Sequence, residues 1–145
     1  MVTSRANGRV KQLRAAFAGQ ARLSGGMVGI EGEHLLREAL RSGMVFKTVF
    51  MSERLEVPAW VPYGVEVLRL ADDVFRSVVE TQAPQGLAAL IVPPVREFAE
   101  VMGAGASGNA PLIVVACGLQ DPGNLGTLVR SAEAFGATGV VTGPG

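Results

Sequence analysis

The sequence predicts an α/β fold built in two parts. Apolar runs with strand character alternate with segments of helical periodicity over residues 1–93. A stretch rich in proline and glycine follows, and a strand, a turn, a helix and a second strand then come near the C-terminus. Apolar residues make up 48% of the 145-residue chain and charged residues 18%, and the net charge is zero. This composition is typical of a globular protein with a core rather than of a disordered chain.

The first part is expected to form a compact α/β sandwich. Leu35, Leu36, Ala39 and Leu40 recur at helical spacing and are expected to face the core. Asp72 or Asp73 is the expected N-cap of the last helix, because a short carboxylate side chain accepts from free amide groups there. The expected helices cover 7–21, 32–43 and 71–80, and the expected strands cover 27–30, 45–51, 65–70 and 87–92.

Residues 94–110 are predicted to be an interdomain linker, with one or two helical turns around 96–102. The segment GAGASG (103–108) matches the dinucleotide-binding pattern G-x-G-x-x-G. That pattern must follow a strand and open a helix, whereas here it follows a helical stretch and precedes a strand. We therefore interpret it as part of the linker.

Several classes of protein are disfavoured by the composition. The lone Cys117 is incompatible with a disulfide framework or a cysteine-based zinc site, and we expect no bound metal. A single cysteine within an apolar strand is typical of a reducing cytoplasm. We expect no membrane association, because no apolar run reaches the ~18 residues of a membrane span and the N-terminus lacks a signal-peptide core.

The zero net charge conceals a basic N-terminal segment, where five of the thirteen lysines and arginines lie within the first 22 residues, ahead of the first acid, Glu31. Such a segment attracts phosphate backbones. The alternative is a solvated helix face that pairs with acids elsewhere, and charge alone leaves both open. The residues are Arg5, Arg9, Lys11, Arg14 and Arg22.

Residues 111–145 are expected to form a right-handed β-α-β unit. PLIVVACGL is a nearly continuous apolar run, typical of a parallel strand covered on both faces. Asp121-Pro122-Gly123-Asn124 is expected to form a turn, with a helix from about 124 to 135 and Gly136 after its last turn. Its apolar stripe is expected to comprise Leu125, Leu128, Val129, Ala132 and Phe135 or Gly136.

Three polar residues gather at the start of this helix. Arg130 lies about 140° around from Leu125 at ~100° per residue, so it is expected to project away from the core. Thr127 shares its face, and Asn124 lies at the first turn. Amide, hydroxyl and guanidinium groups beside free N–H donors suit a phosphate or ribose. The alternative is a capping Asn124 and an Arg130 paired with an acid.

The sequence resembles the SpoU/TrmH branch of the SPOUT RNA methyltransferases in three motifs. QDPGNLGTLVRSAEAFGATGVV follows the pattern N-x-G-x-x-x-R-x-x-x-x-F-G of the family's first catalytic motif. IEGEHLLREAL resembles the EG…L…EAL stretch of the substrate-binding domain that many members carry. TQAPQG resembles the T-x-x-P-Q-G turn before the last strand of that domain. That domain is similar to the ribosomal protein L30e fold and binds RNA. The motifs occur in the right order and span nearly the whole chain.

The resemblance implies an enzyme that transfers a methyl group from S-adenosylmethionine to a ribose 2′-hydroxyl of RNA, with ribosomal RNA favoured over transfer RNA. It places Arg130 in the catalytic role, with Asn124 beside it. Thr127, which shares the face of Arg130, is expected to contact the RNA. It also implies that members form homodimers. In the first domain it points to Gln82, Gln85 and the backbone of Gly86 as RNA contacts, although Pro84 and Gly86 could simply shape the turn. The basic residues of the first helix could follow phosphates.

The resemblance also implies what is missing. Members continue past this point with two segments that form the trefoil knot and hold S-adenosylmethionine, and neither is present here. We therefore expect 111–145 to be the start of a SPOUT domain, no cofactor bound to this chain, and no activity from it alone. An unfinished parallel sheet should expose apolar residues, with self-association or disorder after Pro111. Two alternatives remain: a stand-alone L30e-like RNA-binding module, and a small-ligand domain that binds phosphate at the DPGN turn.

Overall fold

The computed structural model describes residues 1–18, 26–79, 81, 83–95, 97–102 and 110–143. The chain divides into two compact units, Met1–Pro94 and Val95–Gly145. Arg22, Gln82 and the GAGASG segment lie outside the described residues.

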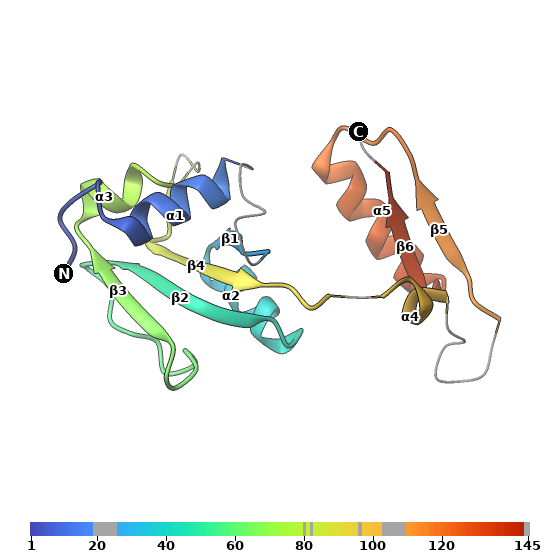
Figure 1. Cartoon of the computed structure of the whole chain (residues 1–145), viewed down its shortest axis with the longest axis horizontal. Helices are drawn as coiled ribbons and strands as arrows, with labels where there is room; N and C mark the ends of the chain where they lie inside the picture. Colours follow the sequence, from blue (N-terminus) through green and yellow to red (C-terminus); the bar gives the residue numbers. More distant parts are fainter. Residues whose placement is uncertain (19–25, 80, 82, 96, 103–109, 144–145) are drawn as a thin grey trace. The chain divides into compact units, whose positions relative to one another are not determined.

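The first unit is an α/β/α sandwich around a four-stranded sheet, which confirms the predicted α/β class. The strands run in the order β1-β4-β2-β3; β4 is antiparallel to both of its neighbours, and β2 is parallel to β3. Figure 1 shows α1 and α3 on one face of the sheet and α2 on the other. The strands are β1 (Val28–Glu31), β2 (Val45–Ser52), β3 (Glu66–Leu70) and β4 (Leu87–Val92), and the helices are α1 (Gly8–Phe17), α2 (Glu33–Arg41) and α3 (Asp72–Arg76).

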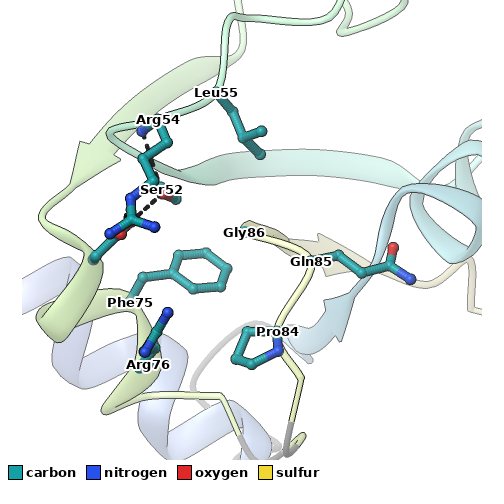
Figure 2. A pocket seen from close by; sticks show the side chains of 9 residues that line it. Ser52, Arg54, Leu55, Phe75, Arg76, Pro84, Gln85 and Gly86 are labelled. Carbon is teal, nitrogen blue, oxygen red and sulfur yellow. Dashed lines mark hydrogen bonds and ion pairs between the residues drawn. The ribbon is translucent and has the colours of Figure 1, made fainter.

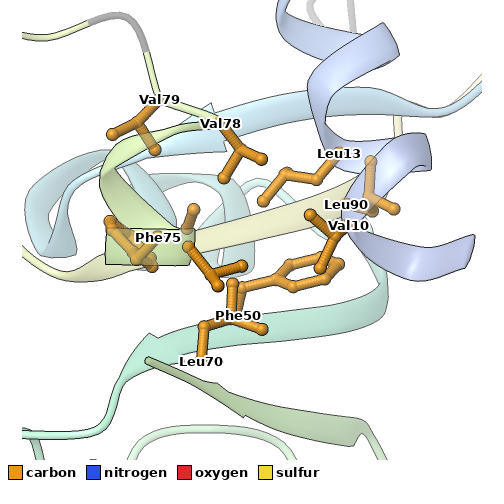
Figure 3. Packing of buried hydrophobic residues seen from close by; sticks show 10 residues of the cluster. Val10, Leu13, Phe50, Leu70, Phe75, Val78, Val79 and Leu90 are labelled. Carbon is orange, nitrogen blue, oxygen red and sulfur yellow. The ribbon is translucent and has the colours of Figure 1, made fainter. Parts of the chain in front are cut away.

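The alternation of side chains along β2 and β4 produces two hydrophobic clusters, one on each face of the sheet. Phe50 and Leu90 point toward the face that α1 and α3 cover, where they pack with Val10, Leu13 and Phe75 (Figure 3). The opposite face packs against α2; its buried residues are Leu36, Ala39, Phe46, Val49, Met51, Leu87, Ala89 and Ile91. Both central strands are therefore covered on both sides.

Two expectations for the first unit are wrong. Leu35 is 49% exposed, because Leu36 and Ala39 alone form the buried stripe of α2. Neither Asp72 nor Asp73 caps α3: Ala71 is the N-cap, and both carboxylates lie in the first turn of the helix. The side chain of Asp72 instead reaches the end of β2, where it accepts from Ser52 Oγ.

The second unit contains a two-stranded parallel sheet of β5 (Ile113–Ala116) and β6 (Gly139–Thr142), joined by α5 (Pro122–Ala134). The helix starts two residues earlier than predicted, because Asp121 is its N-cap and accepts from the Asn124 amide N–H at 2.9 Å. Gly136 has a φ of +78°, as expected for the residue after the last turn. A short helix, α4 (Phe98–Met102), precedes β5.

The expected burial in the second unit is only partly observed. Ala132 is buried, but Val129 is 43% exposed and Phe135 is 84% exposed. Val115 on β5 is 66% exposed, so this strand is not covered on both faces as its apolar sequence predicts. One physical reason is that this sheet has only two strands among the described residues, and the helices that pack on it, α4 and α5, contact mainly β6.

Candidate functional site

Two of the three sequence motifs meet at one edge of the first unit. The strands β1 and β2 end at this edge, and β4 begins there, because β4 is antiparallel to both. The IEGEH segment follows β1, and the turn that contains Gly86 precedes β4. Residues about fifty positions apart in the sequence thus become neighbours, and we refer to this region as the loop edge.

Side chains of the turn fasten it to the start of α2. Thr81 donates its hydroxyl proton to the Glu31 carboxylate, with oxygen–oxygen distances of 2.8 and 2.9 Å. Gln85 Oε1 accepts from the Glu33 amide N–H at 3.2 Å. The N-cap residue of α2 is Gly32, which has no side chain, so Gln85 supplies the missing capping group. The Gln85 side chain therefore already has a structural role.

Gly86 is required by the shape of the turn. Its φ is +78°, in the left-handed region that favours glycine. A Cβ at this position would lie 3.1 Å from both Ser52 Cβ and Leu55 Cδ1. Its carbonyl oxygen accepts from the Ser52 N–H at 2.8 Å. The alternative that Gly86 shapes the turn is thus supported, and its backbone still lies at the loop edge.

A pocket with two arginines opens beside the turn. It is lined by the end of β2, the helix α3 and the turn itself (Figure 2). Arg54 and Arg76 contribute the two cationic groups. The sequence analysis did not single out either arginine. The position of Arg54, just after the carboxyl end of a parallel strand, could have marked it as a candidate, because ligands often bind there.

The basic residues of α1, and Arg5 just before it, are divided between ion pairs and open surface. Arg9 Nε lies 3.0 Å from Glu66 Oε2, and Arg5 Nη2 lies 3.5 Å from Asp73 Oδ2. Arg5 and Arg9 therefore fit the alternative interpretation, in which the basic residues pair with acids elsewhere in the chain. Lys11 and Arg14 are exposed, and neither has an ion-pair partner within the described part of the chain.

The third motif forms a separate polar group on α5. Arg130 Nη2 donates to Thr127 Oγ1 at 3.1 Å, and Thr127 donates to the Gly123 carbonyl at 3.0 Å. A Cβ at Gly126 would lie 3.3 Å from Arg130 Nη1, so the glycine leaves room for the guanidinium group. Arg130 thus folds back toward the helix N-terminus and pairs with neither Asp121 nor Glu133 in the described structure.

Asn124 is also available for a ligand. Because Asp121 caps the helix, the Asn124 side chain is not the cap, and it has no hydrogen-bond partner among the described residues. Asn124, Thr127 and Arg130 are all exposed. An amide, a hydroxyl and a guanidinium group at a helix N-terminus suit a phosphate or a ribose. Three exposed side chains do not enclose a cofactor, and we assign no cofactor-binding residue to this chain.

Neither a metal centre nor a membrane span is found in the described ranges. These ranges contain no group of three or more His, Cys, Asp or Glu residues that could hold a metal ion. None of the helices described has both the length and the apolar character that crossing a bilayer requires.

Known proteins match both units. A family model described as the MRM3-like substrate binding domain matches residues 7–89. The Bacillus subtilis 23S rRNA (guanosine(2553)-2'-O)-methyltransferase RlmP is 33% identical over 144 residues, which cover 99% of this chain and 54% of that protein. A crystal structure of an RNA 2'-O ribose methyltransferase is 31% identical, with a TM-score of 0.72 over 99% of this chain and 55% of that one. An AdoMet-bound rRNA methyltransferase from Sinorhizobium meliloti is 27% identical, with a TM-score of 0.73 over 97% of this chain and 53% of that one.

The family model identifies residues 7–89 as a substrate-binding domain, and the methyltransferase structures match residues of both units. The chain belongs to the SpoU/TrmH family of methyltransferases. It spans about half the length of these three relatives.

Proposed function

We propose that this chain is the N-terminal part of an RNA ribose 2′-O-methyltransferase that uses S-adenosylmethionine and acts on ribosomal RNA. The observation that carries the proposal is the arrangement of Arg130, which Thr127 holds over Gly126 with its remaining donors exposed. The names of the relatives support the choice of reaction, since the B. subtilis relative is a 23S rRNA 2′-O-methyltransferase. Ribosomal RNA is therefore favoured over transfer RNA.

In this proposal Arg130 acts as a hydrogen-bond donor rather than as a base. A guanidinium group has only N–H donors and no acceptor atom, so it donates hydrogen bonds rather than removing a proton. Negative charge would develop on the ribose 2′-oxygen as its proton passes to water. This oxygen would then take the methyl group as the methyl–sulfur bond breaks and a neutral thioether leaves. A fixed guanidinium group stabilises this charge and also binds the neighbouring phosphate. Asn124 would orient the ribose, and Thr127 would position Arg130 or contact the RNA.

The exposed residues of the two units suggest different roles for them. RNA binding would fall to the loop edge of the first unit, through the backbone of Gly86 and the neighbouring arginines, and to Lys11 and Arg14 on α1. Because Gln85 caps α2, we assign it to support of the turn. We propose that S-adenosylmethionine, which supplies the methyl group, is bound by other parts of a cytoplasmic, homodimeric whole enzyme, and that this chain alone is inactive.

A hybrid enzyme tests the proposal. The chain would be joined to the C-terminal half of the B. subtilis relative and assayed with tritiated S-adenosylmethionine and unmodified ribosomal RNA. We expect 2′-O-methylation by the hybrid and none by the chain alone. Arg130→Ala should lower the rate by about 100-fold or more, because loss of one such donor typically costs that much. The control, Arg41→Ala, removes an exposed arginine from α2 and should leave the rate unchanged.

Three outcomes would contradict the proposal. Full activity of the Arg130→Ala hybrid would remove Arg130 from the reaction. A folded but inactive hybrid, whose N-terminal part still binds RNA with a strong salt dependence, would favour the stand-alone RNA-binding module instead. Absence of any RNA binding would favour a small-ligand domain.

A further inference from the structure

The pocket beside the turn has the size and the chemistry of a phosphate site. Its volume is about 160 Å³, below the roughly 300–1,000 Å³ of pockets that hold drug-sized molecules. Ser52, Gly86 and the buried ring of Phe75 contribute to its lining. Arg54 and Arg76 lie on either side of that ring in the view of Figure 2. A phosphate is small enough for this space, and guanidinium groups bind it through paired N–H donors.

Arg54 is held in place by a hydrogen-bonded network. Ser52 Oγ donates to Asp72 Oδ1, and Arg54 Nε forms an ion pair with Asp72 Oδ2. The Arg54 amide N–H donates to Ser52 Oγ at 3.3 Å. The Arg54 side chain is nevertheless 72% exposed, so its terminal nitrogens remain open to a ligand. Such prior positioning reduces the entropy lost when a ligand binds.

No acid among the described residues forms an ion pair with Arg76. The described acids in the pocket lining and next to it in sequence have other partners: Asp72 pairs with Arg54, Asp73 pairs with Arg5, and Glu53 Oε1 accepts from the Asp72 N–H. Arg76 is exposed and has no ion-pair partner in the described ranges. Arg76 therefore lines the same pocket as Arg54, whose side chain is already held in place by Asp72.

We propose that this pocket binds one backbone phosphate of the RNA substrate, with Arg76 as the principal cation and Arg54 as the positioned second donor. The proposal rests on the RNA-binding function proposed above and adds a specific subsite to it. Pro84 and Gly86 would contact the adjoining sugar, because they form the wall next to Arg76. Phosphate contacts fix the register of the RNA without reading its sequence.

The test is RNA binding by the full chain, measured as fluorescence anisotropy of a short labelled RNA hairpin with an internal bulge over a range of salt concentrations. Arg76→Gln is expected to weaken binding roughly tenfold and to reduce the salt slope by about 1. Arg54→Lys keeps the positive charge but loses the planar fork, so we expect a smaller loss. The matched control is Arg41→Gln, which removes the same charge from the last turn of α2.

The outcomes separate the subsite from the wider function. Equal affinity for Arg76→Gln and Arg41→Gln would overturn the subsite alone. Failure of the unmodified chain to bind the hairpin would overturn both proposals. A second measurement does not depend on variants: in a ¹⁵N-labelled chain the amide resonances of Arg76 and Gly86 should shift on addition of the hairpin, whereas that of Arg41 should not. Unchanged Arg76 and Gly86 resonances during binding would also overturn the subsite.

Discussion

Gly86 joins the turn before β4 to the end of β2, because its carbonyl oxygen accepts from the Ser52 N–H. Its positive φ and the 3.1 Å approach of Ser52 Cβ to the position of a Cβ act together. The first effect concerns the backbone alone, and the second concerns packing. Gly64 has a φ of +84° with no atom within 4 Å of its Cβ position, so it isolates the first effect.

Gly86→Ala is expected to destabilise the first unit more than Gly64→Ala. The left-handed conformation costs roughly 1–2 kcal/mol for a residue with a Cβ, and this cost applies to both variants. The crowding against Ser52 and Leu55 adds to it only at Gly86. Urea unfolding followed by the fluorescence of Trp60, the sole tryptophan, measures the difference. Equal losses of unfolding free energy would show that the contacts at Gly86 relax without cost.

At the scale of residues, sequence reasoning identified local features better than long-range ones. Asn124, Thr127 and Arg130 lie within seven positions on one helix, so their spacing predicts that they share a surface. Asp72 was expected to cap its own helix, but it binds Ser52 at the end of a neighbouring strand. That contact depends on the parallel pairing of β2 with β3, which no local pattern in the sequence specifies.

Among the elements, α2 depends on a residue from a distant segment for its N-terminal cap. Gly32 begins the helix without a side chain, and Gln85 accepts from the Glu33 N–H across 52 positions of sequence. The first turn of the helix and the turn before β4 are therefore stabilised by the same hydrogen bond.

Gln85→Ala is expected to lower the free energy of unfolding by about 1 kcal/mol, the usual value of a lost cap. Gln85→Glu should restore most of it, because a carboxylate oxygen also accepts from Glu33 N–H. The control, Gln12→Ala, removes an amide that accepts from Arg9 on the exposed side of α1 and should have little effect. Thermal unfolding monitored by circular dichroism would measure all three. A loss as large at Gln12 as at Gln85 would contradict the capping role.

The strands were predictable from sequence because each is a short segment between turn residues that is either mostly apolar, like β4, or alternates between apolar and polar residues, like β3. β4 was predicted with the same bounds that the structure has, 87–92. The errors concern what covers each element: Leu35 and Val115 are exposed although their apolar neighbours predict burial. Periodicity predicts the face of an element, but the neighbour that buries this face is set by the whole fold.

At the scale of the whole molecule, the chain divides into two compact units. Both buried clusters of the first unit consist of residues of that unit alone. We therefore expect residues 1–94 alone to unfold cooperatively, with the same urea midpoint as the first transition of the full chain. Tryptophan fluorescence reports on this unit, since Trp60 lies in it. A broad, non-cooperative transition would show that the second unit contributes to its stability.

The second unit is expected to drive self-association. Val115 is 66% exposed and Phe135 is 84% exposed, and large apolar side chains exposed on a surface favour contact with another copy. In sedimentation velocity, Val115→Asp should shift the full chain toward monomer. Val57→Asp replaces a comparably apolar, 47% exposed residue of the first unit and should leave the profile unchanged. A monomeric unmodified chain would contradict this expectation.

The strand order β1-β4-β2-β3 also determines when during synthesis the first unit can form. The last strand to leave the ribosome lies between the first two, so β1 has no partner until residues 87–92 emerge. Pairing over such long sequence separations is slow, because the loop must close before its contacts stabilise it. Until β4 emerges, β1 is unpaired and β2 is paired only with β3. The nascent chain then exposes apolar side chains and unpaired strand edges, which chaperones recognise. Translation itself thus sets the earliest moment at which the proposed RNA-binding surface is complete.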